Sequence, residues 1–198
     1  MKLLGITGGV GMGKSTAGEW LRRRGVEVAD PDVLARELAG PGEPALAQIM
    51  QRFGPTVLSA SGELDRARLA RLVFADAGAR ADLEGILHPR IRAAWQAAAA
   101  QWRAAGRPFG AVIIPLLFET GGESAFDAIV CMGCSKGSQW RRLRERGWSD
   151  SETRQRLEAQ LPLQEKIARS DFLVWTDTTL EVVGAQLDAV LKELADDQ

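Results

Sequence analysis

The stretch that decides the fold is LLGITGGVGMGKSTAGEWL, residues 3–21. It joins an apolar run, a glycine-rich turn and a helical pattern in direct succession. The turn, Gly8–Ser15, has the Gly-x-x-x-x-Gly-Lys-Ser spacing of a phosphate-binding loop. Glycines let backbone N–H groups approach phosphate oxygens, and the following helix adds the positive end of its dipole. The stretch predicts a phosphate site, with a glycine-rich turn that binds nothing as the alternative.

Each polar residue of this loop has its own expected role. Lys14 should reach the β- and γ-phosphates, Ser15 should ligate Mg²⁺, and Thr16 should lie on the α-phosphate side. The loop alone does not separate kinases from GTPases or motor ATPases. The chain has no Asn-Lys-x-Asp guanine signature and is short for a large ATPase, which favours a small kinase that uses ATP. The residues expected to bind nucleotide are Gly9, Gly11, Met12, Gly13, Lys14, Ser15 and Thr16.

Five apolar segments are predicted to be buried strands. Their near-continuous apolar character is typical of parallel strands covered on both faces. Helical patterns alternate with them, from Ser15–Arg24 to Thr179–Leu194. This alternation predicts a three-layer α/β fold of the P-loop NTPase type, with about five parallel strands. The predicted strands are KLLGIT (2–7), VEVAD (26–30), GAVIIPLL (110–117), DAIVCMG (127–133) and DFLVWT (171–176).

Two segments interrupt the alternation. Residues 33–107 are largely helical in pattern and too long for a simple crossover, so they are predicted to be a helical insertion over the carboxyl edge of the sheet. Residues 136–169 carry nine Lys or Arg against five Asp or Glu. The remainder, about 1–32, 108–135 and 170–198, forms the core of a single domain, which 198 residues are enough to build.

Composition excludes several classes of protein. A net charge of −1 gives no overall attraction to nucleic acid or to an anionic membrane. The N-terminus is too short and glycine-rich for a signal peptide, and no apolar stretch is long enough to span a bilayer, so a cytoplasmic location is expected. Cys131 and Cys134 form a Cys-x-x-Cys pair, but with His88 as the only histidine we expect buried structural residues rather than a redox or zinc site.

Two aspartates close the second predicted strand. Asp30 should lie at the carboxyl edge of the sheet beside the phosphate loop, where open α/β sheets bind their ligands. A carboxylate there can accept a proton from an attacking hydroxyl or position Mg²⁺ through water. Asp32 is interpreted as the cap of the helix that follows.

At this point the chain resembles the dephospho-CoA kinase family. The resemblance rests on five stretches in order, and it extends to about residue 175. The first stretch alone is shared by many kinases, whereas the ordered set is specific. The stretches are GITGGVGMGKST, VADPDVLAR, LHPRI, IIPLLFE and QWRRLRER. Family members use Mg-ATP to phosphorylate the ribose 3′-hydroxyl of dephospho-CoA in the last step of coenzyme A synthesis, so the resemblance implies ATP, Mg²⁺ and this small-molecule acceptor.

The resemblance also assigns roles on the acceptor side. It implies that Asp30 is the general base and that the insertion holds the acceptor, with Asp32, His88 and Arg92 as contacts. Without it, a lone histidine near a helix start is more often structural. It further implies that Glu119 faces the ligand cleft, where the alternative is a strand ending in a solvated glutamate.

The residues before Glu119 and the basic segment complete the predicted site. Leu116, Leu117 and Phe118 are expected to lie over the site, since Pro115 breaks the strand. Arg142 and Arg146 are four residues apart on one helical face and match the two lid arginines of the family. Arginine suits phosphate because its planar fork pairs with two oxygens and stays charged. The basic segment is therefore predicted to be a lid over ATP, with Arg142 acting in catalysis alongside Lys14; a solvated charged helix is the alternative.

The chain departs from the family pattern at one position of the expected nucleotide site, and two rival hypotheses stay open. Thr176 stands where the family usually has asparagine, which affects the adenine contact rather than the reaction class. The first rival is another small-molecule kinase, of the nucleoside monophosphate or shikimate kind. The second is a nucleotide-binding regulator without an acceptor. Nothing in the chain resembles a nucleic-acid reader, and the resemblance is compatible with a monomer.

Overall fold

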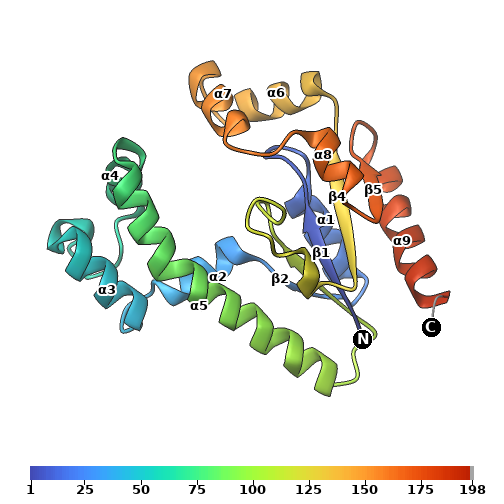
Figure 1. The fold of residues 1–198 in the computed structure, drawn as a ribbon, viewed down its shortest axis with the longest axis horizontal. Helices are drawn as coiled ribbons and strands as arrows, with labels where there is room; N and C mark the ends of the chain where they lie inside the picture. The colour runs from blue at the N-terminus through green and yellow to red at the C-terminus, as the bar shows by residue number, and fades with distance from the viewer. Residues whose placement is uncertain (197–198) are drawn as a thin grey trace. The chain divides into compact units, whose positions relative to one another are not determined.

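A computed structural model describes residues 1–196 of the chain. Its centre is a five-stranded parallel sheet in the order β2-β3-β1-β4-β5 (Figure 1). The predicted α/β class, the five strands and their parallel direction are confirmed. The strands are β1 (Lys2–Thr7), β2 (Glu27–Ala29), β3 (Phe109–Ile113), β4 (Ala128–Gly133) and β5 (Phe172–Trp175).

The helices belong to two compact units. One unit holds Met1–Asp30 and the residues from Gln101 on, and therefore the whole sheet; the other is Pro31–Ala100. The helices are α1 (Lys14–Arg23), α2 (Pro31–Leu38), α3 (Pro44–Phe53), α4 (Arg66–Ala75), α5 (Ala77–Ala104), α6 (Lys136–Glu145), α7 (Asp150–Glu158), α8 (Leu163–Ala168) and α9 (Leu180–Asp196), with short 3-10 turns η1 (Pro55–Val57) and η2 (Glu123–Ala125).

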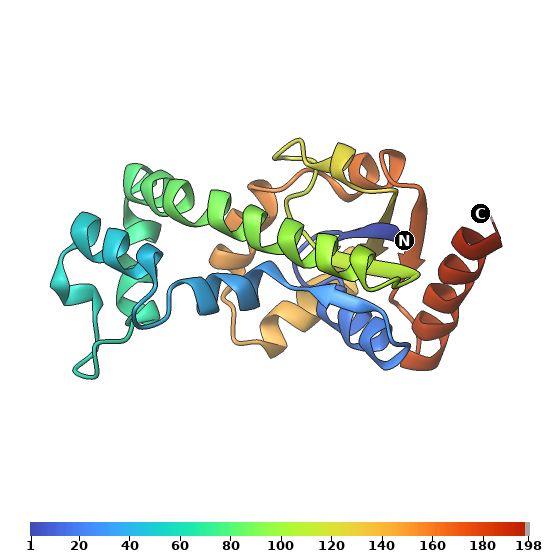
Figure 2. The same cartoon turned by 90° about the horizontal axis from the view of Figure 1, so that it is seen from below.

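Both faces of the sheet are buried along the central strands β1, β3 and β4, as their apolar character predicted, whereas Leu173 and Trp175 of the edge strand β5 are exposed. Along β1, Leu4 and Ile6 point to the face that α1 and α9 cover. Gly5 points to the other face, where Leu117 packs. Figure 2 shows α1 on one side of the sheet and η2 with α8 on the other. Because β1 and β4 are parallel, the residues that follow them lie at the same edge of the sheet.

The contact between α1 and α9 depends on a missing side chain. A Cβ on Gly184 of α9 would lie 2.1 Å from the indole ring of Trp20 on α1. The same indole donates from Nε1 to Asp188 Oδ1 at 3.1 Å. Glycine therefore allows α9 to approach α1 closely enough to pack against the partly buried ring of Trp20.

The third strand ends earlier than predicted. The Ile114 N–H still bonds to Ile6 O at 2.8 Å, but Pro115 has no N–H and the chain turns away from the sheet. The prediction that Leu117 and Phe118 lie over the site is wrong, because both are buried in the core with Ile129. Leu116 is the exposed member of the three, at 37%.

The Pro31–Ala100 unit is all-helical and has its own core, around Ile49, Val57 and Leu69. Its longest element, α5, continues through Pro89. His88 was expected near a helix start, and this is wrong: it lies inside the helix. Pro89 cannot donate to the carbonyl of Gly85, four residues before it, while the side chain of Arg90 donates from Nη1 to the next carbonyl, Ile86 O, at 2.6 Å.

Candidate functional site

The phosphate loop adopts a shape that only glycine permits at two of its positions. Gly8 has φ +132°, and a Cβ there would lie 2.3 Å from Met132 O of β4. Gly13 has φ +91°, and its Cβ would approach the Thr176 methyl group at 3.2 Å. Positive φ values and these close approaches exclude other residues without strain. The motif therefore lies between β1 and α1 as predicted, closely packed against β4 and the chain after β5.

Lys14 covers the loop from the first turn of α1. Its Nζ donates to Gly8 O at 2.8 Å and to Gly9 O at 2.9 Å. An ammonium group held over the loop, together with the helix N-terminus, makes the space inside the loop attractive to anions. Ser15 is exposed beside it, and the Met12 side chain turns inward, where its Sδ accepts from Gly9 N–H at 3.2 Å. Met12 can therefore meet a nucleotide only through its backbone.

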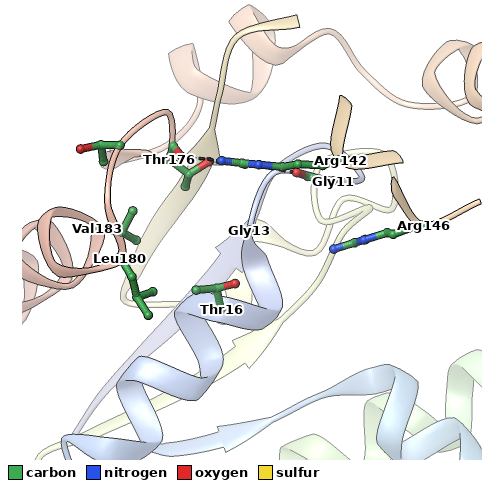
Figure 3. Close-up of a pocket in the computed structure, with 9 residues that line it drawn as sticks. Gly11, Gly13, Thr16, Arg142, Arg146, Thr176, Leu180 and Val183 are labelled. Carbon is green, nitrogen blue, oxygen red and sulfur yellow. Dashed lines mark hydrogen bonds between the residues drawn. The ribbon is translucent and has the colours of Figure 1, made fainter. Parts of the chain in front are cut away.

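A pocket of about 220 Å³ opens next to the loop (Figure 3). It brings together Thr16 of α1, Arg142 and Arg146 from α6 and its end, and residues after β5. Positive charge thus lies on one side and the aliphatic side chain of Leu180 on another. The lining consists of Gly11, Gly13, Thr16, Arg142, Arg146, Thr176, Thr178, Leu180 and Val183.

Arg142 is held by protein groups at the edge of this pocket. Its guanidinium donates to Thr176 Oγ1 at 2.8 Å, to Thr176 O at 2.5 Å and to Gly11 O at 3.4 Å (Figure 3). The hydroxyl of Thr176 is thereby turned toward α6 rather than toward the pocket. These bonds hold the guanidinium of Arg142 against the loop, while Arg146 is exposed.

Asp177 secures the start of the same helix. Its carboxylate accepts from the Ser135 N–H at 2.8 Å, and Ser135 is the N-cap of α6. Partial burial would raise the pKa of Asp177, but hydrogen bonds from Ser135 and Ser138 and the charge of Arg142 hold it below its ordinary value. Asp177 therefore stays ionised and fixes the start of α6, the helix that carries Gln139 and Arg142.

Asp30 follows β2 directly, at the same edge of the sheet as the loop. It is not on a neighbouring strand, because β3 lies between β1 and β2. Two strand spacings separate them, about 10 Å. The interpretation of Asp32 as a helix cap is wrong: α2 begins at Pro31, so Asp32 lies in its first turn, where a carboxylate still favours the helix dipole.

His88 and Arg92 are brought together on α5. They are four residues apart in one continuous helix and therefore share a face, and both are exposed. They belong to the Pro31–Ala100 unit, whereas the loop, Asp30 and the arginines of α6 belong to the other.

Glu119 is neither the end of a strand nor solvated. Its Oε1 accepts from Lys166 Nζ at 2.7 Å and from Leu161 N–H at 2.8 Å, and its side chain is 17% exposed. Lys166 of α8 is completely buried and also donates to Pro115 O at 3.0 Å. The carboxylate therefore ties the chain after β3 to the chain between α7 and α8.

The ion pair gives a testable pH dependence. Burial would raise the pKa of Glu119, but hydrogen bonds from Lys166 and from the Leu161 N–H outweigh it, so the pKa lies below the ordinary 4.5. A carboxyl group with a lowered folded-state pKa stabilises the fold above its unfolded pKa and loses that contribution as pH falls through the folded value. We expect the stability difference between wild type and Glu119→Gln to shrink progressively below about pH 4.5, measured by urea unfolding from pH 7 to pH 3.5. A difference that stays constant would contradict the ionised pair.

The two cysteines are structural. Both are buried and form no disulfide, and burial raises the pKa of Cys131 to about 11. A thiol with so high a pKa carries almost no thiolate at neutral pH, which agrees with the structural interpretation. Across residues 1–196 no group of three His, Cys, Asp or Glu side chains is placed to hold a metal ion. Within the same residues, no helix is both long and apolar enough to cross a membrane.

Sequence reasoning missed three residues that shape the site. Gln139, Gln160 and Lys166 are far from the loop in the chain, yet the first two bond to Val10 and the third anchors Glu119. Gln139 could have been found, because it lies three residues before Arg142 on the same helix face. Gln160 and Lys166 follow no local pattern.

Comparisons with known proteins agree with this geometry. The family model for dephospho-CoA kinase matches residues 2–181. The dephospho-CoA kinase of Anaeromyxobacter dehalogenans is 44% identical over 195 residues, 98% of this chain and 92% of that protein. The crystal structure of TT1252 from Thermus thermophilus superposes with a TM-score of 0.80 at 34% identity, covering 98% and 97% of the two chains. Dephospho-CoA kinase from Campylobacter jejuni has the same fold, with a TM-score of 0.73 at 23% identity over 98% of each chain.

Proposed function

Since the chain belongs to the dephospho-CoA kinase family, whose members phosphorylate a hydroxyl group, we propose that it transfers the γ-phosphate of ATP to the ribose 3′-hydroxyl of dephospho-CoA. The observation that supports ATP as the phosphate donor is the meeting of the phosphate loop and α6 at one edge of the sheet. The loop supplies backbone N–H groups and Lys14, and α6 supplies Arg142 and Arg146. The choice of dephospho-CoA as the acceptor is supported by relatives that align over nearly the whole chain and are named for it.

The proposed chemistry is in-line phosphoryl transfer. Lys14, the loop amides and the α6 arginines balance the charge that spreads over the γ-phosphate oxygens in the transition state. Asp30 orients the attacking hydroxyl and takes its proton. Strand β3 separates it from the loop strand by about 10 Å in all, which leaves room for both the γ-phosphate and the hydroxyl between them. Positioning and electrostatics then supply most of the rate enhancement.

The residues at the loop fit Mg²⁺. A magnesium ion prefers oxygen ligands and usually takes only one or two of them from the protein, the rest coming from nucleotide phosphates and water. The exposed Ser15 hydroxyl in the first turn of α1 is such a donor, and Asp30 offers a carboxylate at the same edge. When bound, the ion would neutralise charge on the β- and γ-phosphates.

The acceptor side is proposed to involve the Pro31–Ala100 unit. His88 and Arg92 share an exposed face of α5, and a cationic group there suits the phosphates of the acceptor. Asp32, exposed in the first turn of α2, completes this set. Glu119 supports the lid indirectly, because its Oε1 is engaged by Lys166 and Leu161.

The acceptor assignment is tested by the release of ADP. Purified protein with Mg-ATP is offered dephospho-CoA, nucleoside monophosphates and shikimate separately, and the product is weighed by mass spectrometry. We expect dephospho-CoA alone to stimulate ADP release and to gain one phosphate. If another acceptor stimulated ADP release, the substrate assignment would be wrong and the proposed mechanism would stand. If none of the three acceptors stimulated it, the proposal would be contradicted.

A further inference from the structure

Both backbone polar groups of Val10, in the middle of the phosphate loop, are bound by glutamine side chains of the lid segment, residues 136–169. Gln139 Nε2 donates to Val10 O at 2.8 Å, and Gln160 Oε1 accepts from Val10 N–H at 3.1 Å. The partners dictate how each amide is turned, because a backbone N–H only donates and a carbonyl oxygen only accepts. Gln139 must present its nitrogen and Gln160 its oxygen.

These bonds fix two successive peptide planes of the loop. In a planar trans peptide, C=O and N–H point in opposite directions. Gln139, by holding Val10 O, therefore directs the N–H of Gly11 to the opposite side. The preceding plane is held at both ends, since Gln160 binds the Val10 N–H while Gly9 O accepts from Met12 N–H at 3.2 Å and from Lys14 Nζ at 2.9 Å.

Helix α6 lies directly on the loop, so the contact is a packed one. Gln139 is only 5% exposed and Leu143 is fully buried. A Cβ on Gly9 would lie 3.1 Å from Gln139 Nε2, and one on Gly11 would lie 3.2 Å from Leu143. Arg142 from the same face reaches Gly11 O at 3.4 Å. Donors from one helix thus hold two consecutive loop carbonyls, which would otherwise be free to turn toward a phosphate and repel it.

Gln160 ties a second part of the lid segment to the same peptide. It follows α7, and the next residue, Leu161, donates its N–H to Glu119 at 2.8 Å. Its position is therefore set by the Lys166–Glu119 anchor rather than by α6. The loop is thus connected to the lid segment at two places that are 21 residues apart in the chain.

We propose that Gln139 and Gln160 are positioning residues that aim the loop amides at the nucleotide phosphates and couple the lid segment to the loop. The inference rests on the proposed function in that it concerns the ATP side of the same site. It requires opposite hydrogen-bonding roles of the two glutamines: Val10 O needs a donor at position 139, and the Val10 N–H needs an acceptor at position 160.

The same substitution made at both positions tests this. Gln160→Glu keeps an acceptor for the Val10 N–H, whereas Gln139→Glu sets a carboxylate against the Val10 carbonyl. Each variant adds one negative charge beside the same residue, so their difference reports the direction of the hydrogen bond. We expect Gln139→Glu to raise the Kd of a non-hydrolysable ATP analogue by roughly tenfold or more, the effect of a buried acceptor left unpaired, and Gln160→Glu to raise it distinctly less. The Kd of AMP, which lacks the β- and γ-phosphates, should change little in both.

Further measurements separate positioning from simple structural damage. Gln160→Leu, which removes the acceptor, should bind the ATP analogue more weakly than Gln160→Glu, and thermal unfolding monitors whether each variant is folded. In turnover assays Gln139→Glu should raise KM for ATP more than KM for the acceptor. Equal Kd values for the two glutamate variants, or equal values for Gln160→Leu and Gln160→Glu, would overturn the inference. The binding assays contain no acceptor, so a failure of the dephospho-CoA assignment would leave this result unaffected.

Discussion

Replacing Asp30 by asparagine is expected to abolish most turnover while leaving ATP binding intact. A positioned general base contributes about 10²- to 10⁴-fold to a reaction rate, so kcat should fall by about that factor. Asparagine keeps the size and the hydrogen-bonding oxygen of the side chain but cannot take a proton. The measurement is kcat from ADP release with dephospho-CoA, beside the Kd of a non-hydrolysable ATP analogue.

Asp32 provides the matched control for this prediction. It lies two residues further on, in the first turn of α2, and is proposed to contact the acceptor. Asp32→Asn removes the same charge from nearly the same place, so it should raise KM for the acceptor with a much smaller effect on kcat. If Asp30→Asn weakened ATP binding as much as turnover, or if the two variants behaved alike, the assignment of Asp30 as the base would be lost.

The largest expected effect on stability comes from Lys166→Met. Lys166 is completely buried, and its ammonium binds Glu119 Oε1 and Pro115 O. Methionine fills a similar volume but removes the ammonium donor from Pro115 O and from the Glu119 carboxylate, which is 17% exposed and keeps the Leu161 N–H. Removing one partner of a buried ion pair costs about 3 kcal/mol or more of the free energy of unfolding, which urea denaturation at pH 7 would measure.

Two further variants identify the cause of that loss. Adding Glu119→Gln to Lys166→Met removes the uncompensated charge and should restore part of the stability. Arg144→Met breaks an ion pair of the same lid segment, Arg144 with Asp150, in which the side chains are 60% and 50% exposed. It should leave the free energy of unfolding nearly unchanged, because exposed pairs contribute little. If Lys166→Met and Arg144→Met lowered the free energy of unfolding equally, the burial of the Lys166–Glu119 pair would not explain the loss.

The Lys166–Glu119 pair is linked to the phosphate loop through the lid segment, so variants that weaken this pair should also affect the nucleotide site. Lys166 and Glu119 hold the turn that contains Leu161, and Gln160 immediately before it reaches Val10. Damage to the anchor should therefore appear in nucleotide affinity as well as in stability. We therefore expect Glu119 to affect nucleotide binding indirectly: it fixes the turn that contains Leu161, and Gln160 in the same turn contacts the loop.

The local features of the fold could be predicted because each depends on neighbouring residues. The strand before Gly8, the turn and the helix from Lys14 follow from hydrophobic runs, glycine spacing and a helix pattern over fewer than 20 residues. The roles proposed for Lys14 and Ser15 are inferred from the same local motif. The family could also be inferred, since its five stretches occur in order along the chain.

Other features depended on packing between distant residues. The order β2-β3-β1-β4-β5 places β3 between the loop strand and Asp30, and no local pattern encodes which strands become neighbours. Leu117 and Phe118 were predicted to lie over the site, but after the turn at Pro115 they pack in the core with Ile129. Helix α5 continues through Pro89, although a proline usually ends or kinks a helix, so the position of His88 inside a helix could not be predicted from the local sequence.

The sequence by itself determined the chemistry of this protein: a phosphate loop, a following lysine and serine, and the family to which the chain belongs. Only the tertiary structure decided which distant residues position the loop and the lid segment. Gln139, Gln160, Glu119 and Lys166 bond across 42 to 150 residues of chain, to backbone groups and to each other. The physical reason is that a motif concentrates charge and backbone donors locally, whereas their direction is set by hydrogen bonds from elements that meet only when the sheet and its helices are packed.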